Sequence, residues 1–414
     1  MRRPALTDPG FPPVPEPDLT PADLIARAEA MVPQLLARQS EVERRTFYGE
    51  DVHEMFREAG FYRITVPRRY GGYEFEFETF LRVVMILARG CPSTAWMFCL
   101  GAAHSLVTAM LFEEKAQDEL FRGGDFIAPA VIAPGGTATR SPDGGWIIDG
   151  TWNYCSGIPY ATHFIGHAMV AGDDGEPPHP LLFIAPRGTW TRLDDWGGQL
   201  GLKGSGSHSV RFDRAEIPDH FGLEHTHLGE VSVTSGTSGS ALHAHPQYGG
   251  APMSSMCLEG ATLGVGIAQG ALEAYGEVLS TRRTSTPPIT LRVDDPDYQR
   301  WFGQATAMIS AAEAITLSAI RQWHDLTTRE PAAFTLEEDL RIAMICREAA
   351  ELAWRGVEAV IQPTAGTSSV TGDGHLERVW RDLSTCHSHA GFAVLLTTAL
   401  PRVYTQAHFG RLTA

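Results

Sequence analysis

The chain has 414 residues, 43% of them hydrophobic, a composition typical of a soluble globular protein with room for two or three domains. Its formal net charge of −16 argues against nucleic acid or an anionic membrane as the main partner. No apolar run reaches the roughly eighteen residues of a membrane span, and the N-terminal segment lacks the apolar core of a signal peptide. The six cysteines form no C-x-x-C pair, and a chain this long needs no disulfides to fold. We therefore expect a cytoplasmic protein with reduced thiols.

The N-terminal part predicts a tail followed by a helical domain. Residues 1–19 are rich in proline, so we expect them to be disordered or to form an arm on a neighbouring chain. The helical domain is expected over residues 20–124, where Thr20 can cap the first helix and Pro21 suits the first helical position. The expected helices are 20–45, 50–59, 77–89, 93–112 and 113–121.

Residues 125–218 predict a central antiparallel β domain, because short apolar or alternating runs are separated there by Gly, Pro and Asp. The expected strands are 128–133, 145–152, 164–171, 180–185 and 210–217. Residues 219–251 are rich in Gly, Ser, Thr and His and predict a long loop, which in a compact protein is functional or mobile.

Residues 252–414 return to helical spacing and predict a C-terminal four-helix bundle. Its helices are expected near 253–283, 295–325, 336–362 and 376–408. The fold class expected for the whole chain is α+β.

Four segments, in order and at plausible spacing, resemble the acyl-CoA dehydrogenase superfamily over about residues 20–410. They are VPRRYGG at 66–72, LGLKGS at 200–205 followed by the strand 210–217, the helix at 270–273 that leads to Arg282, and ERVWRD at 377–382. The resemblance implies an acyl-CoA dehydrogenase-like fold, and a homotetramer in which the flavin site borrows residues from a neighbouring subunit.

The position of the dehydrogenase base is occupied by another residue. In the commonest dehydrogenases of this superfamily, a catalytic glutamate followed by glycine lies nine residues after the arginine of the R-D pair. Counting nine from Arg381 gives Ala390, which Gly391 follows. The carboxylate that would abstract a proton from an acyl-CoA is therefore missing.

The segment WNYCSG at 152–157 resembles the two-component flavin-dependent monooxygenases on the same fold, the group D oxygenase components. The resemblance implies that reduced FMN or FAD diffuses from a separate NAD(P)H-flavin reductase and reacts with O₂ to a C4a-hydroperoxyflavin. That species would hydroxylate an aromatic or heteroaromatic small molecule. The sequence shows no nucleotide-binding βαβ unit for NAD(P)H, which agrees with a partner reductase.

The same resemblance assigns three catalytic residues. His389 lies eight residues after Arg381, where monooxygenases of this family place a histidine, and a ring that titrates near neutral pH suits a base on the substrate. Ser156 would lie near flavin N5, and His104, in an otherwise apolar helix, would line the substrate pocket. The alternatives are buried, hydrogen-bonded core histidines and a serine that satisfies backbone groups at a strand end.

Cofactor contacts are expected from Trp152, Asn153, Ser156, Ser205 and Arg282. A guanidinium binds phosphate with a bidentate fork, so Arg282 is the candidate for the flavin phosphate. Ser205 is equally well explained as a turn residue. The histidine pairs 225/227, 243/245 and 387/389 lack the context of a metal motif, so no metal is expected.

Two other functions stay open. An acyl-CoA dehydrogenase with a relocated base would use Glu259, near the start of the first bundle helix. A nitrogen-oxidising enzyme on the same fold would act on an amino-sugar nucleotide.

Overall fold

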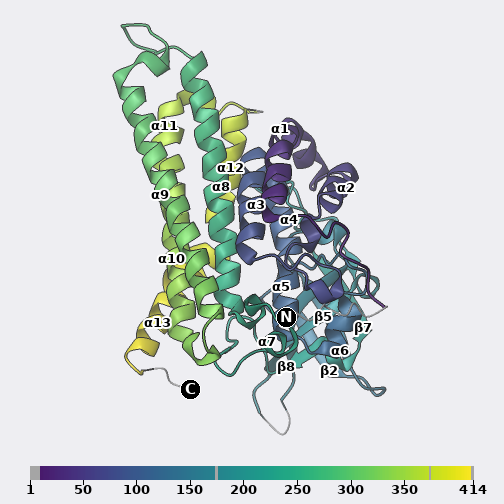
Figure 1. Cartoon of the computed structure of the whole chain (residues 1–414). Coiled ribbons are helices and arrows are strands. Elements are labelled where there is room, and N and C mark those ends of the chain that lie inside the picture. Colours follow the sequence, from purple (N-terminus) through teal and green to yellow (C-terminus); the bar gives the residue numbers. More distant parts are fainter. Residues whose placement is uncertain (1–9, 173–175, 373, 412–414) are drawn as a thin grey trace.

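The computed structural model describes residues 10–172, 176–372 and 374–411. N-terminal helices, a central sheet and long C-terminal helices follow one another along the chain, in the predicted order (Figure 1). The long helices stand side by side, and the N-terminal helices and the sheet lie against one side of them (Figure 1).

The N-terminal helices are α1 (Pro21–Arg45), α2 (Glu50–Glu58), α3 (Phe77–Gly90), α4 (Pro92–Ala102), α5 (His104–Leu111) and α6 (Glu114–Leu120). The predicted cap is confirmed, because Thr20 and Asp23 form a capping box at the start of α1. The single helix expected over 93–112 is two, α4 and α5, joined at Ala103 with helical dihedral angles. The stretch Pro92–Leu111 is long and apolar enough to cross a membrane, but 89% of its most apolar window is buried inside the protein. It is therefore a core element of the fold.

The expected disordered tail is only partly described, since residues 1–9 lie outside the described residues. Residues 10–19 pack on the helical domain, which differs from the prediction. The Phe11 ring meets the Tyr70 ring edge-on, with centroids 4.9 Å apart, and Glu16 pairs with Arg27 at 2.7 Å. Apolar and ionic contacts within the chain thus hold this proline-rich segment.

The central sheet has eight strands: β1 (Ala130–Val131), β2 (Gly136–Arg140), β3 (Trp146–Trp152), β4 (His163–Val170), β5 (His179–Pro186), β6 (Thr191–Arg192), β7 (Val210–Ile217) and β8 (Gly222–Glu224). Its order is β6-β7-β3-β2-β4-β5-β8, with β1 beside β4. The sheet is mixed and not purely antiparallel, because β4 pairs in parallel with both β1 and β2. After β3 the chain crosses the end of β2 and returns as β4 on its far side. This crossover, residues 153–162, carries the WNYCSG segment beyond Trp152.

The predicted long loop at 219–251 is more ordered than expected. It adds β8 to the edge of the sheet and forms the short helix α7 (Ser238–Leu242). Gln247 is fully buried, accepts a hydrogen bond from the Phe77 N–H and donates one to the Phe75 carbonyl. The Tyr248 hydroxyl donates to the Thr65 carbonyl at 3.0 Å. These bonds pin the segment to the N-terminal helices.

The C-terminal helices are α8 (Pro252–Thr281), α9 (Pro296–Thr327), α10 (Leu336–Gly356), α11 (Gln362–Ala365), α12 (His375–His387) and α13 (Leu400–His408). The helices α8, α9, α10 and α12 pack together as the predicted bundle. The single last helix expected over 376–408 is interrupted, because a π-helical stretch, Gly391–Ala399, separates α12 from α13. His389 lies in this break.

A polar clamp fixes α12 to both other domains. Glu43 of α1 pairs with Arg378 at 3.1 Å and with Arg381 at 2.8 Å. Asp382 accepts a hydrogen bond from the buried Leu202 N–H. The backbone at Gly201 comes so close that a Cβ there would lie 2.1 Å from the Arg381 carbonyl oxygen. The ERVWRD and LGLKGS segments thus meet each other directly.

The clamp predicts a pH dependence of stability. Burial raises the pKa of Asp382 to about 7, whereas the same side chain has an ordinary value of 3.8. The folded state therefore holds this proton more tightly between about pH 4 and pH 7, so its stability falls as pH rises through that window. Asp382→Asn keeps an acceptor and has no such proton. As pH rises through this window, the free energy of unfolding of Asp382→Asn should increase relative to that of the wild type, by at most about 4 kcal/mol in total. Thermal midpoints of the two proteins, measured at a series of pH values, follow this difference.

The control for this measurement is Asp382→Leu, which leaves the Leu202 N–H buried without an acceptor. We expect it to cost about 1–3 kcal/mol at any pH in the window. A gap between the asparagine variant and wild type that does not change with pH would contradict the prediction.

Candidate active site

The crossover segment lies directly against α4. Gly157 has φ +96°, a left-handed conformation, and a Cβ there would lie 2.9 Å from the Met97 carbonyl oxygen and 3.1 Å from Gly101. Only glycine combines this backbone conformation with so close an approach. The neighbouring Ser156 is thereby brought to the surface of α4.

Ser156 belongs to a chain of hydrogen-bonded hydroxyls. Its Oγ accepts the indole N–H of Trp96 at 3.0 Å and lies 2.7 Å from Ser207 Oγ, which lies 2.7 Å from Ser205 Oγ. Three hydroxyls carry three protons, and two of these bond the serines to one another. Ser205 and Ser207 are more deeply buried than Ser156, with 0%, 3% and 8% of their surfaces exposed, so a spare proton on Ser205 or Ser207 would remain unpaired at a cost of about 1–3 kcal/mol. The chain therefore donates toward Ser156, whose own proton is left for a ligand.

Trp96 connects Ser156 to His389. The His389 ring meets the Trp96 ring edge-on, with centroids 5.5 Å apart. The Gly391 N–H donates to His389 Nδ1 at 3.2 Å, so the neutral ring carries its proton on Nε2. Part of the ring is open to solvent in the single chain, yet the protein around it still lowers the pKa of His389, which favours the neutral form.

His104 lies further along the same helical face, since positions 96, 100 and 104 are separated by four residues each. Its Nδ1 donates to the Ala128 carbonyl at 2.7 Å. Its Nε2 lies 3.9 Å from Glu259 Oε2 on α8, and both side chains are almost completely buried. Burial lowers the pKa of His104 to about 4 and raises the pKa of Glu259 well above its ordinary value. Burial therefore favours the neutral form of both groups.

A cleft of about 790 Å³ adjoins this site, between α1, α12 and the loop that holds Trp196 and Lys203. Two contacts join its wall to the site: the Trp196 ring meets Tyr154 of the crossover, and Thr46 hydrogen-bonds His208 at 3.0 Å. Charged side chains from three segments line the cleft, among them Glu43, Lys203 and Arg381.

Two family models match the chain, "Acyl-CoA dehydrogenase, N-terminal domain" over residues 24–119 and "Acyl-CoA dehydrogenase, C-terminal domain" over residues 259–394. Together they span more than half of its length. The chain belongs to the acyl-CoA dehydrogenase family. The architecture predicted from the sequence is thereby confirmed, with a mixed sheet in place of the antiparallel one.

Relatives with known activities are flavin-dependent monooxygenases. The oxygenase subunit HsaA of a flavin-dependent monooxygenase from Rhodococcus jostii is 26% identical over 375 residues, which cover 88% of this chain and 93% of that one. The oxygenase component of an FADH(2)-dependent resorcinol hydroxylase from Rhizobium sp. is 27% identical over 363 residues, 85% of this chain and 86% of that one. The solved structure of XiaF from Streptomyces sp., in complex with FADH2 and glycerol, has a TM-score of 0.83 at 25% identity, over 94% of this chain and 96% of that one.

Within this fold, the side chains of two residues expected to contact the cofactor are fully buried in the single chain. Trp152 is fully buried among sheet residues, and its indole N–H donates to the His167 carbonyl at 2.9 Å, so it is a core residue. Ser205 is also fully buried, and it acts only by donating to Ser207.

The other expected cofactor residues have different positions. Asn153 is exposed, with Oδ1 accepting the Ser209 hydroxyl at 2.9 Å and its amide N–H groups left for a ligand. Arg282 is exposed at the far end of α8, about 34 Å along that helix from Glu259. No side-chain hydrogen bond or ion pair of Arg282 occurs among the described residues.

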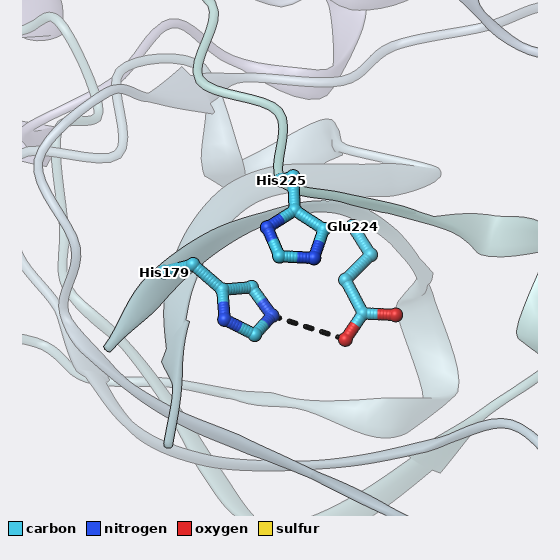
Figure 2. A group of neighbouring side chains, drawn as sticks. All are labelled: His179, Glu224 and His225. Carbon is cyan, nitrogen blue, oxygen red and sulfur yellow. Dashed lines mark hydrogen bonds and ion pairs between the residues drawn. The ribbon is translucent and has the colours of Figure 1, made fainter. Parts of the chain in front are cut away.

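One group of possible metal ligands lies away from this site, at the β5–β8 edge (Figure 2). His179 is bonded to Glu224 at 3.0 Å, and Arg140 pairs with the same carboxylate at 2.6 Å. The His179 and His225 rings are stacked, with centroids 3.8 Å apart and planes 19° from parallel. A metal must lie close to the plane of each ring it binds, and nearly parallel planes do not meet beside the rings. The ion pairs explain this group.

Trp96 is the functional candidate that the sequence did not reveal. A tryptophan inside a uniformly apolar helix is read as core, and Trp96 is indeed buried. The available signal was its position eight residues before His104, on the same face of the helix.

The geometry predicts the protonation state of His104. Its ring should stay neutral from pH 8 to about pH 5, with the proton on Nδ1, because burial disfavours the cation and the Ala128 carbonyl holds that proton. Nitrogen NMR of protein labelled in histidine can identify the tautomer, and the signal lost in His104→Gln provides the assignment. A midpoint near 6.5, or a proton on Nε2, would show that the ring lies in another environment.

Proposed function

We propose that the protein is the oxygenase component of a two-component flavin-dependent monooxygenase that hydroxylates an aromatic or heteroaromatic small molecule. The single observation that carries this proposal is the hydroxyl chain ending at Ser156, whose Oγ bonds the Trp96 indole, with the His389 ring packed edge-on against the same indole. The names of the relatives support the same reaction.

The residues present fit a reduced FMN or FAD. Ser156 offers a hydroxyl proton and Asn153 offers amide N–H groups, which are the donors that the polar edge of a flavin ring requires. When bound, the reduced flavin supplies two electrons, so that one atom of O₂ enters the substrate and the other leaves as water. Trp96 and the apolar residues of α4 exclude water from this side of the site.

His389 handles a proton in this proposal. In the observed geometry its Nε2–H can donate to an oxygen atom. To act as a base on a phenol it must release the Gly391 N–H from Nδ1, either to accept a proton there or to move its own proton there by exchange with solvent, which the open edge of the ring permits. His104 and Ser156 complete the catalytic set.

Electrons are proposed to come from a separate NAD(P)H-flavin reductase through diffusible reduced flavin. The relatives named as oxygenase subunit or component support this division of labour. We place the protein in the cytoplasm, since its six cysteines are all free thiols, as a reducing compartment maintains them.

A dehydrogenase using Glu259 is the weaker alternative. A base that abstracts a proton from carbon must be ionised, whereas burial raises the pKa of Glu259. A dehydrogenase would also purify yellow with tightly bound FAD and bleach with an acyl-CoA.

The other alternative is oxidation of a nitrogen atom in an amino-sugar nucleotide. The assay below tests it when amines are offered as substrates beside phenols.

We further propose a homotetramer. The stretch Gly391–Ala399 is strongly apolar, yet Val394 is 61% exposed in the single chain. A neighbouring subunit that covers this stretch would also close the open side of His389, two residues before its start. Arg282 would then reach a flavin bound by another chain.

The hydroxylation proposal predicts distinct effects of two neighbouring histidines. With a flavin reductase, NADH, O₂ and a panel of phenols, the wild type should give a hydroxylated product and little hydrogen peroxide. His389→Ala should lower the hydroxylation rate by about 100-fold or more, as loss of a positioned acid–base group does. Ser156→Ala should lower the ratio of product to hydrogen peroxide about tenfold.

The matched control is His387→Ala, two residues away on α12. His387 bonds Glu351 at 3.1 Å and stacks on Trp354, so it faces α10 and not the site. The hydroxylation rate of the His387→Ala variant should stay within about twofold of the wild-type rate. The mechanism is wrong if His389→Ala and His387→Ala have equal rates and equal thermal midpoints.

The assembly proposal predicts that Val394→Asp weakens a tetramer of 45.1 kDa chains. Burying a carboxylate in an apolar contact is costly, so sedimentation should shift toward smaller species. Ala332→Asp, at an exposed turn before α10, should leave the assembly unchanged. A wild-type protein that sediments as a monomer at micromolar concentration would rule the proposal out.

A further inference from the structure

A second cavity, of about 160 Å³, lies between the segment that contains α7 and the connection from α9 to α10. Its lining comes from residues 240–249 on one side and 326–334 on the other, and none of these belongs to the candidate active site. A protein cavity of about 150 Å³ holds a benzene molecule, so this one has room for a single small ring. A sphere of 160 Å³ is about 7 Å across, so one such ligand reaches every wall.

The hydrogen bonds of Gln117 fix the tautomer of His243, one of the lining residues. The Gln117 amide nitrogen donates to the Ala109 carbonyl at 3.1 Å and to the Phe112 carbonyl at 2.6 Å. The Gln117 oxygen is therefore an acceptor, and His243 Nε2, which lies 2.8 Å from it, carries the proton. Burial lowers the pKa of His243 to about 4, which favours the neutral ring. His243 Nδ1 thus keeps a lone pair, with no partner among the described residues.

His245 and Arg329 bring hydrogen-bond donors to the same cavity. The Gln247 N–H donates to His245 Nδ1 at 3.4 Å, so the neutral His245 ring carries its proton on Nε2. Within the part of the chain that the structure describes, neither this Nε2–H nor the Arg329 guanidinium has a hydrogen-bond or ion-pair partner. The described residues that line the cavity include no carboxylate. Arg329 therefore brings a positive charge that a ligand can neutralise.

The C-terminal end of α9 also borders the cavity, and a helix C-terminus disfavours an anion. Its carbonyls are partly occupied, since that of His324 accepts the Thr327 hydroxyl at 2.7 Å and that of Leu326 accepts the Arg329 N–H at 3.2 Å. A helix end carries about half an elementary charge, whereas the guanidinium carries a full one. The balance at this cavity therefore favours an anion.

We propose that this cavity binds a small aromatic hydroxy acid. Arg329 and His245 donate to its carboxylate, and its hydroxyl group donates to His243 Nδ1. A guanidinium matches a carboxylate with two parallel hydrogen bonds. The ring packs against Leu326 and Phe334, two of the apolar residues in the lining. The bound acid would tie the α7 segment to the α9–α10 connection.

The test follows the ring of His243 by nitrogen NMR of protein labelled in histidine, with the signals assigned by their loss in His243→Gln. The probes are 3- and 4-hydroxybenzoate, the two corresponding hydroxybenzamides and benzoate, all without flavin. At least one hydroxybenzoate should move the Nδ1 signal upfield, as a hydrogen bond to a free lone pair does. Its affinity should exceed that of its amide by about tenfold or more, because the amide has no charge for Arg329. Benzoate, which lacks the hydroxyl group, should move the Nδ1 signal much less.

Three variants separate recognition from stability. Arg329→Gln removes the charge and should reduce the preference for acid over amide to about twofold or less. Arg329→Lys keeps the charge without the planar fork and should retain a preference of at least about threefold. The matched control is Arg355→Gln, at an exposed arginine about 28 Å along α10 from Leu336, which should keep the wild-type preference. Because each preference is a ratio of affinities within one protein, a general loss of stability does not imitate these results.

An Nδ1 signal that no hydroxybenzoate moves at millimolar concentration would overturn the proposal. An equal preference for acid over amide in Arg329→Gln and in the wild type would also overturn it. Neither outcome bears on the proposed function, which depends on hydroxylation with reduced flavin. Conversely, a protein that binds these acids through Arg329 but hydroxylates no phenol would refute the proposed function alone.

Discussion

The indole of Trp96 is the contact on which the candidate site depends. A buried tryptophan N–H needs an acceptor, and Ser156 is the acceptor available to it. That bond occupies one lone pair of the serine, and Ser207 fills the other, which fixes the direction of the remaining proton. The ring of the same tryptophan packs against His389. One side chain of α4 thus positions a group from the sheet and a group from the last helices.

This contact is possible only because the three domains are held closely together. The crossover reaches α4 through Gly157, whose backbone conformation excludes other residues. Helix α12 is held by Asp382, which binds the Leu202 N–H, and by the two arginines on Glu43. His389 follows α12 directly, at the break before the π-helical stretch, a type of irregularity that is frequent at functional sites. Motifs far apart in the sequence are therefore parts of a single packing arrangement.

The sequence was informative where local rules decide the structure. Thr20 and Pro21 marked the start of α1, and apolar spacing located the bundle helices. Strand β2 could not be found this way, because in GTATR only Ala138 is buried and the segment lacks an apolar pattern. The parallel pairing of β4 depends on the side of β2 to which the crossover returns, which no local pattern encodes.

Among the site residues, the outcome followed the chemistry of each side chain. Trp96 lies in an apolar helix and Trp152 at the end of a strand, and only the fold shows that Trp152 packs in the sheet while Trp96 bonds Ser156. Ser205 and Ser207 are equally plausible from sequence, yet Ser207 alone touches Ser156. A hydroxyl chain is a property of three-dimensional contacts, so spacing along the chain could not rank its members.

Glu259 shows how environment decides between two functions for one residue. As a base in a dehydrogenase it would have to be charged, which needs a nearby cation or access to water. Its carboxyl lies 3.9 Å from the ring of His104, whose pKa burial has itself lowered, so the ring offers no stable cation to stabilise a charge on Glu259. Ala390 stands at the usual position of the base, so the carboxylate of the commonest dehydrogenases is missing there. The exclusion of water that makes Glu259 a poor base favours the reaction of reduced flavin with O₂, because water near the flavin would divert that reaction to hydrogen peroxide.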